Sequence, residues 1–354
     1  MPAAGRPPAL VDVARLAGVS LTTASRALNP DSTHPISASA RQRVTAAAAQ
    51  LAYQPNTMAR ALRTRRMPTI AVLVHDVADP YFAEVIRAIS ASASEEGLLT
   101  FVCNTERDPA TELRYLAMLR LSRVAAVLFA GGGLEDAAYR RAVDEHAAGI
   151  AAYGGAVVAL APRSQRWAAE VADNHGGAAL AAEHVVRLGH RRVALVMGPE
   201  RLRTSREREA GYRSVLEAAG IEPVVVAGDY TREGGAAAAA ELLELGREVT
   251  AVLVSNDNMA IGVLAALRER GVSVPADVSV VGFDDVPGLE FIHPALTTVR
   301  VPMAAIGSAG VARALAILRG SDRNRRLRVH PVELVERASS APPLRTATGS
   351  GALG

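Results

Sequence analysis

Apolar and polar residues alternate in two different ways along the chain, and the change falls at about Pro68. Before it, apolar side chains recur every three or four positions, which is the spacing of amphipathic helices. After it, short apolar runs are separated by longer amphipathic stretches. That second pattern predicts parallel sheets covered by helices on both faces. We therefore expect a small all-α head followed by a larger α/β body.

The body contains more apolar runs than one sheet holds comfortably, because twisted open sheets rarely exceed about ten strands. Two lobes are therefore expected, with right-handed crossovers between parallel strands. The expected strands are Ile70–Val74, Leu98–Cys103, Ala125–Phe129, Val157–Leu160, Val193–Met197, Val224–Ala227, Ala251–Ser255, Val278–Phe283 and Val332–Val335. The expected helices are Ala83–Glu95, Glu112–Leu121, Gly176–Arg187, Arg206–Ala219, Ala260–Glu269 and Met303–Leu318.

Three short helices are expected in the head, and Gly18 separates the first two. Glycine adopts the left-handed conformation that ends a helix at little steric cost. Ser20 is placed to cap the second helix, and Ser37 or Ser39 the third. The apolar positions of the shared core are Leu10, Val13, Ala14, Ala17, Ala24, Leu28, Val44, Ala48 and Leu51, with Thr23 in part. Two short helices joined by a glycine turn are typical of a helix-turn-helix, whose second helix reads the major groove.

The second helix would present Leu21, Thr22 and Arg26 outward. Arg26 suits a bidentate contact with guanine, which discriminates against other bases by roughly 1–3 kcal/mol. Leu21 and the Thr22 methyl suit thymine methyls. The remaining polar residues suit phosphate contacts, which set register without reading sequence; they are Ser20, Thr23, Ser25 and Asn29. For each hydroxyl, local capping is an equally good interpretation.

The charge distribution favours a polyanionic partner at one end of the chain only. Residues 1–66 contain nine arginines and two aspartates, a net charge of +7, whereas the whole chain of 354 residues carries +3. The remaining residues therefore carry −4. A basic head on an acidic body indicates duplex DNA as the partner of the head. A solvated arginine-rich tail is the weaker alternative, because the arginines lie within a helical pattern.

A further short helix is expected directly after the head, within residues 55–63. Such a short helix is marginal in isolation, so it should order only against a partner. Leu62 lies between arginines and suits the minor groove, where apolar wedges kink the duplex. An amphipathic linker helix that packs on the body, with Met58, Ala59 and Leu62 on one side, fits the residues equally well.

Several classes of protein are disfavoured by what the sequence lacks. The chain has no lysine, which removes a P-loop and Schiff-base chemistry, and Gly131–Gly133 lacks the glycine order of a dinucleotide site. The eight histidines show no paired metal spacing, so no enzyme, metal or other cofactor is expected. Cys103, the single cysteine, is expected to be a buried hydrophobe. No apolar stretch is long enough to span a membrane, and the N-terminus lacks the plan of a secretion signal. We therefore expect a cytoplasmic protein, associated with the nucleoid when it binds DNA.

Polar and aromatic residues follow several expected strands of the body. In open α/β sheets, ligands bind outside the carboxyl ends of strands, so a cleft between the lobes is a candidate ligand site. The residues at these ends are Asp76, Asp79, Tyr81, Phe82, Asn256, Asp257, Asp284 and Asp285. Each acidic residue taken alone is more often a helix cap or a turn residue. A solute-binding transport protein would share these lobes, but the basic head and the missing signal argue against it.

Residues 10–63 resemble the DNA-binding head and hinge of the lactose/galactose repressor (LacI/GalR) family. The matching residues are Asp12-Val13-Ala14, Ala17-Gly18-Val19-Ser20, Thr23, Ser25-Arg26, Asn29, Arg41, Val44, Leu51, Tyr53-Gln54-Pro55-Asn56 and Ala59-Arg60-Ala61-Leu62-Arg63. The resemblance implies that the positions of Leu21, Thr22 and Arg26 select the operator.

The same resemblance implies that Leu62 intercalates and that Met58 and Ala59 pack against the hinge of a second subunit. Asn56 and Arg63 complete the expected DNA-binding set. Two features depart from the family. The loop at residues 29–36 is longer than usual, and Leu21 is less polar than in some members.

The body resembles the effector domain of this family, which is similar to periplasmic sugar-binding proteins. The matching residues are Asp79-Pro80-Tyr81-Phe82, Asp173-Asn174, Gly189-His190-Arg191-Arg192, Arg206-Glu207-Arg208, Gly211-Tyr212, Asn256-Asp257, Val281-Gly282-Phe283-Asp284-Asp285 and Pro294–Val299. The effector-binding residues that follow are Asp79, Phe82, Arg208, Tyr230, Asn256 and Asp284.

In that set, Phe82 would stack on the ring of the effector and Tyr230 would form an aromatic wall. An arginine and a carboxylate can bracket vicinal hydroxyls or a purine edge. A sugar-like effector is therefore expected, with a purine as second choice. Val301 and Met303 are apolar where relatives sometimes have polar or aromatic contacts.

The expected architecture is thus an all-α helix-turn-helix head and an α/β two-lobed, periplasmic-binding-protein-like body with parallel sheets. The expected boundaries are residues 1–54 for the head, 55–68 for the hinge helix and linker, 69–338 for the effector-binding and dimerisation body, and 339–354 for a disordered tail. Within the body, lobe 1 is expected at about 69–189 and 300–328, and lobe 2 at about 190–299 and 329–338. The expected function is a repressor that binds a palindromic operator as a homodimer or tetramer. A small effector would alter its DNA affinity allosterically, as inducer or corepressor.

Overall fold

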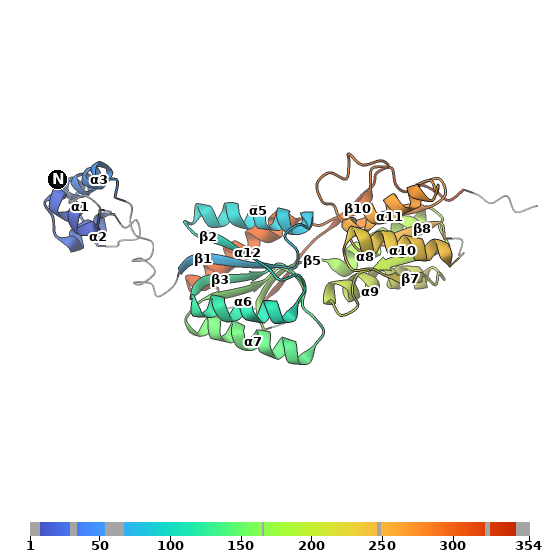
Figure 1. The fold of residues 1–354 in the computed structure, drawn as a ribbon, viewed down its shortest axis with the longest axis horizontal. Coiled ribbons are helices and arrows are strands. Elements are labelled where there is room, and N and C mark those ends of the chain that lie inside the picture. The colour runs from blue at the N-terminus through green and yellow to red at the C-terminus, as the bar shows by residue number, and fades with distance from the viewer. Residues whose placement is uncertain are drawn as a thin grey trace, which may run out of the picture. The chain divides into compact units, whose positions relative to one another are not determined.

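The computed structural model describes residues 8–28, 34–53, 67–164, 166–245, 249–322 and 326–344. They form two compact units, divided at Met67. The described part of the first unit consists of three helices (Figure 1), which are α1 (Leu10–Ala17), α2 (Leu21–Ala27) and α3 (Ala38–Gln50). The expected hinge residues Asn56, Met58, Ala59, Leu62 and Arg63 lie outside the described residues, as does Asn29.

The head folds as its local sequence signals predict. Val13, Ala24 and Val44, one from each helix, are fully buried in a shared core. Gly18 ends α1 with a φ of 64°, the left-handed conformation that glycine tolerates. The Ser20 hydroxyl accepts a hydrogen bond from the backbone N–H of Thr23, at 3.1 Å. Of the two serines placed to cap α3, Ser37 is the cap.

The described part of the second unit contains two six-stranded sheets, one in each lobe. In the first lobe the strand order is β11-β5-β4-β3-β1-β2, and in the second it is β12-β10-β9-β8-β6-β7. The strands are β1 (Met67–Val74), β2 (Leu99–Asn104), β3 (Val124–Phe129), β4 (Ala156–Ala159), β5 (Ala168–Ala172), β6 (Val193–Met197), β7 (Val224–Ala227), β8 (Ala251–Val254), β9 (Ser279–Asp284), β10 (Thr297–Arg300), β11 (Leu327–His330) and β12 (Glu333–Val335). The second sheet is parallel except for β12, which runs antiparallel to β10.

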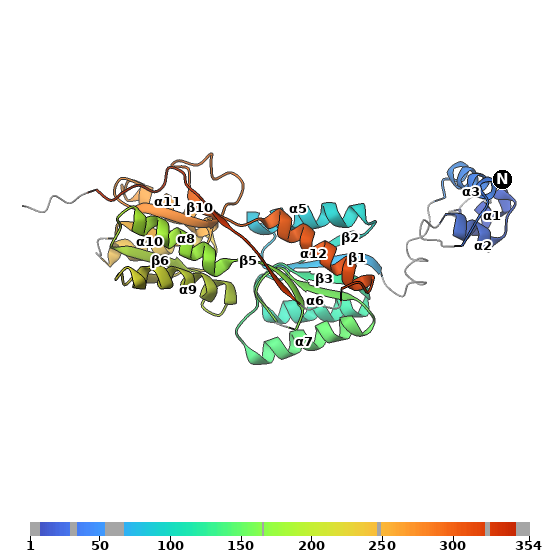
Figure 2. The same cartoon turned by 180° about the vertical axis from the view of Figure 1, so that it is seen from behind.

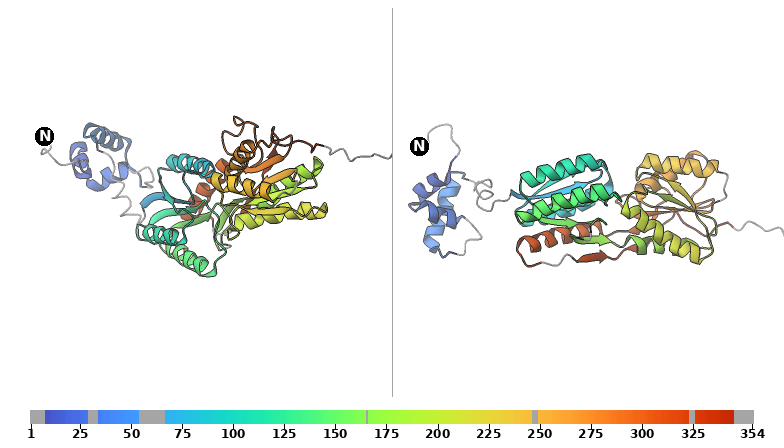
Figure 3. Two further views of the ribbon diagram at one scale, coloured as in Figure 1. Left: turned by 45° about the vertical axis from the view of Figure 1, so that its right-hand side comes forward. Right: turned by 90° about the horizontal axis from the view of Figure 1, so that it is seen from below.

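Helices cover both faces of each sheet (Figures 1 and 3). In the first lobe α6 and α7 pack together on one face, and α5 and α12 on the other. In the second lobe the pairs are α8 with α9 and α10 with α11. The helices are α5 (Pro80–Glu95), α6 (Pro109–Leu121), α7 (Ala137–Ala152), α8 (Asn174–Arg187), α9 (Arg203–Ala218), α10 (Arg232–Glu244), α11 (Asp257–Glu269) and α12 (Met303–Leu318). No helix in these described ranges is long and apolar enough to cross a membrane.

Within the described residues, the chain passes between the lobes at three points, and Figure 2 shows the last of them as a red segment. The crossings lie between β5 and α8, between β10 and α12, and between β11 and β12. The expected lobe boundary after Gly189 is therefore wrong, because α8 packs on α9 and on the second sheet. The expected boundary after residue 328 is also too early, since all of β11 pairs with β5 in the first sheet.

The tail was expected to be disordered from Ser339, but its described part, residues 339–344, is ordered. Ser339 is fully buried, its hydroxyl accepts a hydrogen bond from Thr297 N–H at 2.8 Å and it donates to the Val280 carbonyl at 2.6 Å. The Ala341 carbonyl accepts a further bond from the Ser279 hydroxyl. These hydrogen bonds attach residues 339–341 to the second sheet. The polar composition of the segment, on which the expected disorder was based, gave no sign of them.

Candidate functional site

The outward surface of α2 matches the expected reading helix. Leu21 is 52% exposed, and Thr22, Ser25 and Arg26 are also exposed, whereas the intervening alanines are buried. The Ser20 and Thr23 hydroxyls lie 2.8 Å apart. Both hydroxyls therefore have a partner within the chain, and the exposed side chains of α2 are Leu21, Thr22, Ser25 and Arg26.

Arginines of α3 hold the first two helices in place. Arg41 donates a hydrogen bond of 3.2 Å to the Ala27 carbonyl, and Arg43 donates one of 3.1 Å to the Ala17 carbonyl. Both carbonyls lie at helix C-termini, where positive charge is favourable. Some arginines of the head thus stabilise its fold, and the net charge of the head could not distinguish them from arginines that face DNA.

A cavity of about 70 Å³ lies between the lobes, at the carboxyl ends of the strands. All six expected effector residues line it, namely Asp79, Phe82, Arg208, Tyr230, Asn256 and Asp284. The structure adds polar residues that were not singled out for this role, including His75, Arg107, Asn174 and Thr204. Asp76, Asp257 and Asp285 do not line the cavity, although the sequence places them at the same strand ends.

Arg208 is fixed by contacts on several sides. Its Nη2 donates to the Asp284 carboxylate and its Nε to the Asn174 side-chain oxygen, each at 3.0 Å. Its Nη1 donates to the Ser255 carbonyl, and the guanidinium carbon lies 3.7 Å from the centre of the Phe283 ring. A guanidinium held this firmly offers a ligand an already oriented hydrogen-bonding group.

Burial raises the pKa values of two carboxylates at the end of this sheet. Burial raises the pKa of Asp284 to about 7, against the attraction of Arg208 and with a further contribution from Asp79. Burial and the neighbouring Asp284 raise the pKa of Asp257 as well. Asp257 accepts hydrogen bonds from the Thr298 hydroxyl and from Val286 N–H, so its role is structural.

Asp285 is used in the same structural way as Asp257. Its carboxylate lies 2.7 Å from both Arg300 and Arg337. Asp284 and Asp285 have φ values of 122° and 57°, which non-glycine residues adopt at a cost of roughly 1–3 kcal/mol each. Such strain is common where a backbone turns a side chain into a site, and here it turns Asp284 toward Arg208.

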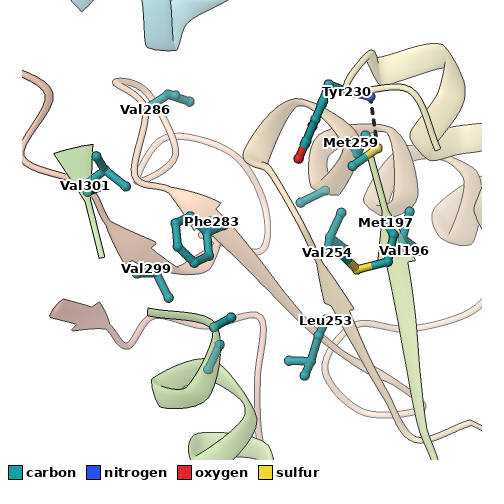
Figure 4. Close-up of a cluster of buried hydrophobic side chains, with 14 of the residues drawn as sticks. Val196, Met197, Tyr230, Leu253, Val254, Met259, Phe283, Val286, Val299 and Val301 are labelled. Atoms are coloured by element: carbon teal, nitrogen blue, oxygen red, sulfur yellow. Dashed lines mark hydrogen bonds between the residues drawn. The ribbon is translucent and has the colours of Figure 1, made fainter. Parts of the chain in front are cut away.

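Aromatic rings form two walls of the cavity. Phe82 packs edge-on against Tyr81 and His75, with ring centres 5.2 and 5.8 Å apart. In the second lobe the Tyr230 hydroxyl lies 2.7 Å from the Ser205 hydroxyl. Figure 4 shows the Tyr230 backbone N–H directed at the Met259 sulfur, at 3.3 Å, beside the apolar core of this lobe. Both rings are thus in contact with neighbouring side chains.

Two of the expected site residues also serve as helix caps. Asp79 accepts a hydrogen bond from Tyr81 N–H at the start of α5, and Asn256 accepts one from Met259 N–H at the start of α11. Burial raises the pKa of Asp79. Asp79 and Asn256 therefore have both of the roles that the sequence offered, because each caps a helix and each lines the cavity.

His75 is a cavity residue that sequence reasoning missed. It follows β1 directly, and burial together with the charges of Arg163 and Arg107 lowers its pKa to about 3. The imidazole is therefore neutral near pH 7 and has one donor and one acceptor nitrogen. Val301 and Met303, whose apolar character was noted, are buried and do not line the cavity. Among the described residues, no group of three or more His, Cys, Asp or Glu residues could hold a metal ion.

Comparisons with known proteins agree with this division of the chain. Residues 9–56 match the family model of bacterial regulatory proteins, lacI family, and residues 182–340 match that of a periplasmic binding protein-like domain. The chain is 32% identical to the HTH-type transcriptional regulator DegA of Bacillus subtilis (strain 168) over 338 residues. The aligned region covers 94% of this chain and 98% of DegA.

Two solved structures share the fold along most of the chain. One is the lac repressor dimer bound to operator and the anti-inducer ONPF, with a TM-score of 0.83 and 30% identity over 95% of this chain and 100% of the other. The other is a complex of the transcriptional regulator CelR with cellobiose, with a TM-score of 0.69 and 30% identity over 94% and 100% of the two chains.

Proposed function

Because the chain belongs to the lacI family of bacterial regulatory proteins, we propose that it is an effector-controlled repressor that binds a palindromic operator as a homodimer. That it is a DNA-binding transcriptional regulator follows from the family. The repressor role, the dimer and the effector are the proposal. Its relatives are regulators, and no catalytic activity is proposed for it.

In this proposal α2 enters the major groove, with Leu21, Thr22 and Arg26 toward base edges and Ser25 toward the backbone. Support comes from their exposure on one face, opposite the buried Ala24. The resemblance extends the DNA contacts to Asn29, Asn56, Met58, Ala59, Leu62 and Arg63, and to the hydroxyls of Ser20 and Thr23.

The effector is proposed to bind in the cavity between the lobes. The observation that carries this proposal is the convergence of all six expected residues on one buried cavity around the fixed guanidinium of Arg208. Rings of Phe82 and Tyr230 suit the apolar side of a ring, and the Arg208–Asp284 pair suits hydroxyls. A sugar or sugar derivative is the effector proposed, in line with the cellobiose of the CelR complex, and a purine is the second candidate.

The size of the cavity indicates how the effector acts. About 70 Å³ is small for a site that holds a sugar, so an effector enters only if the lobes separate. The three described chain segments that connect the lobes form the natural hinge. An effector that contacts both lobes then favours one lobe angle, and a coupling of roughly 1–3 kcal/mol to the head gives about 5–150-fold regulation.

An exposed apolar edge supports the homodimer. Strand β2 is at the edge of the first sheet, and its residues Leu99, Phe101 and Val102 are exposed. An unpaired edge with large apolar side chains invites association with another chain. A second copy of this chain is the partner proposed, as in the dimeric lac repressor.

The proposal is tested by two measurements on the full chain. A thermal-shift screen against sugars, sugar phosphates and nucleosides should show a rise in Tm for one class, because a ligand of the native state stabilises it by mass action. Selection from random duplexes should enrich a palindrome whose affinity falls steeply with salt. Absence of any enriched palindrome, with and without the ligand found, would refute the operator proposal.

A further inference from the structure

A second cavity, of about 520 Å³, lies beside the effector cavity and is separate from it. It is bordered by the first turns of α7, by the segment between β4 and β5, and by the first residue of α9. Five arginines line it, which are Arg140, Arg141, Arg163, Arg166 and Arg203. We refer to it as the arginine cavity.

Positive charge in the arginine cavity exceeds the negative charge available to it. Arg163 is neutralised by Glu112, with which it forms two hydrogen bonds of 2.7 and 3.0 Å. The other four guanidinium groups have two carboxylates between them. Glu135 lies 3.3 Å from Arg140 and 3.5 Å from Arg203, and Asp144 lies 3.9 Å from Arg166.

Arg141 forms no ion pair with any described residue. The excess of positive charge is therefore local, since the chain outside residues 1–66 carries a net charge of −4. A basic concavity in an acidic body concentrates small anions. Guanidinium groups bind phosphate oxygens in pairs, which makes phosphate the anion that this lining suits best.

One wall of the arginine cavity is apolar and rigid. Trp167 lines it and stacks on Phe129, with ring centres 4.9 Å apart and planes inclined by 20°. Arg163 packs on the opposite side of this pair, 4.5 Å from the centre of the Phe129 ring. A stacked indole next to exposed guanidinium groups suits a small organic molecule that carries phosphate, because the indole covers the organic part.

The arginine cavity spans the junction of the two lobes. Arg203 belongs to the second lobe, and its Nη1 donates to the Arg163 carbonyl at 2.9 Å. Next to it, Glu135 N–H donates to the Arg201 carbonyl at 2.8 Å, and Leu134 pairs with Leu202 as an isolated bridge. An anion held by Arg203 and by the arginines of α7 would connect the lobes at this point.

The two cavities share a wall. Arg163 Nε donates to the Gly131 carbonyl at 2.6 Å, and Gly131 lines the effector cavity. We propose that the arginine cavity binds a small phosphorylated metabolite and that its occupation favours the lobe arrangement described here. The protein would thus have a second regulatory site, in addition to the effector site between the lobes.

The test uses the full chain with pyrophosphate as the probe, at constant ionic strength. Calorimetry measures affinity, and fluorescence localises the binding, because Trp167 is the only tryptophan of the chain. Saturable binding with a matching change in Trp167 fluorescence is expected. The double variant Arg141→Gln/Arg166→Gln should lower the affinity about tenfold or more, whereas Arg268→Gln, an exposed arginine of α11, should leave it unchanged.

Three results would overturn the proposal. They are a lack of saturable binding, equal affinity in the double variant, and an equal loss of affinity in Arg268→Gln, which would indicate a bulk charge effect. The two glutamine substitutions are at exposed positions, so folding should be preserved, and circular dichroism checks this. The outcome is independent of the effector site, because neither Arg141 nor Arg166 lines that cavity.

Discussion

Arg208 and Asp284 face each other across 3.0 Å in the cavity between the lobes, and each side chain is only 6% exposed. Arg208 comes from α9 and Asp284 from the end of β9, so both belong to the second lobe. The pair is therefore assembled within one lobe and stays assembled when the lobes separate. An effector would meet an oriented donor and acceptor on one side of the cleft and the Phe82 ring on the other.

The raised pKa of Asp284 predicts that the stability of the fold depends on pH. The pKa of Asp284 is about 7 in the folded chain, whereas an aspartate ordinarily has a pKa of 3.8. The folded state thus retains a proton that the unfolded state has lost, and this contribution to stability disappears as pH rises through 7. From this group we expect the free energy of unfolding to fall by at most about 1.4 kcal/mol per pH unit between pH 3.8 and 7 and to level off above pH 7. A measurement of Tm between pH 6.5 and 8.5 therefore records the end of the fall, under about 1 kcal/mol, and then a plateau.

The variant Asp284→Asn should reduce that slope, because it has no proton to lose. Asp257, whose pKa is raised in the same direction, should maintain part of it. The chosen window avoids His75, whose lowered pKa acts below pH 6.5 and with the opposite sign. If the dependence of Tm on pH were unchanged in Asp284→Asn, the raised pKa of Asp284 would be contradicted.

The buried pair Arg163–Glu112 should be important for stability. Both side chains are 4% exposed, and Tyr139 also donates to Glu112, at 2.7 Å. Glu112→Gln leaves the arginine buried without its counter-charge, a change that typically costs about 3–5 kcal/mol. Denaturant unfolding measures the loss. Glu84→Gln, which removes the carboxylate that pairs with the exposed Arg87, is the control and should leave the midpoint nearly unchanged.

Arg26 should contribute to operator choice. If its guanidinium contacts a guanine, Arg26→Ala lowers affinity for the selected operator by roughly 1–3 kcal/mol and relaxes preference at one base pair. Fluorescence anisotropy with operators varied at each position measures both effects. Arg15→Ala removes an exposed arginine of α1 as a control. A uniform loss over all sequences would assign Arg26 to the phosphate backbone instead.

The exposed edge of β2 predicts the oligomeric state. Phe101 is 44% exposed on this edge strand. Phe101→Asp places a charge in the proposed interface and should convert the dimer to a monomer in sedimentation velocity. Phe291→Asp, at a much more exposed phenylalanine of the second lobe, should remain dimeric. A dimer that survives Phe101→Asp would place the interface elsewhere.

Local signals in the sequence were sufficient for the head and for most of the strand–helix alternation. Gly18 and Ser20 act within a few residues of their own positions, so the turn and the cap could be read directly. Strand β5 and helices α7 and α10 were missed, because alanine-rich segments carry little local pattern. The four-residue strands β10 and β11 were missed as well. Asp79, Phe82, Asn256 and Asp284 were indicated by their places at strand ends, whereas Arg208 and Tyr230 came only from the resemblance to a family. The structure brings all six to one cavity.

Contacts between distant segments were beyond the sequence. Nothing within α8 indicates which sheet it covers, and its packing on α9 and on the second sheet decides the lobe boundary. Likewise Asp257 and Asp284 follow similar strands, yet only Asp284 turns into the cavity, whereas Asp257 is hydrogen-bonded inside the lobe. The sequence determined what each segment forms, because caps, turns and periodicity are local. Tertiary structure decided which side chains meet, because burial, charge pairing and cavity shape depend on residues far apart in the chain.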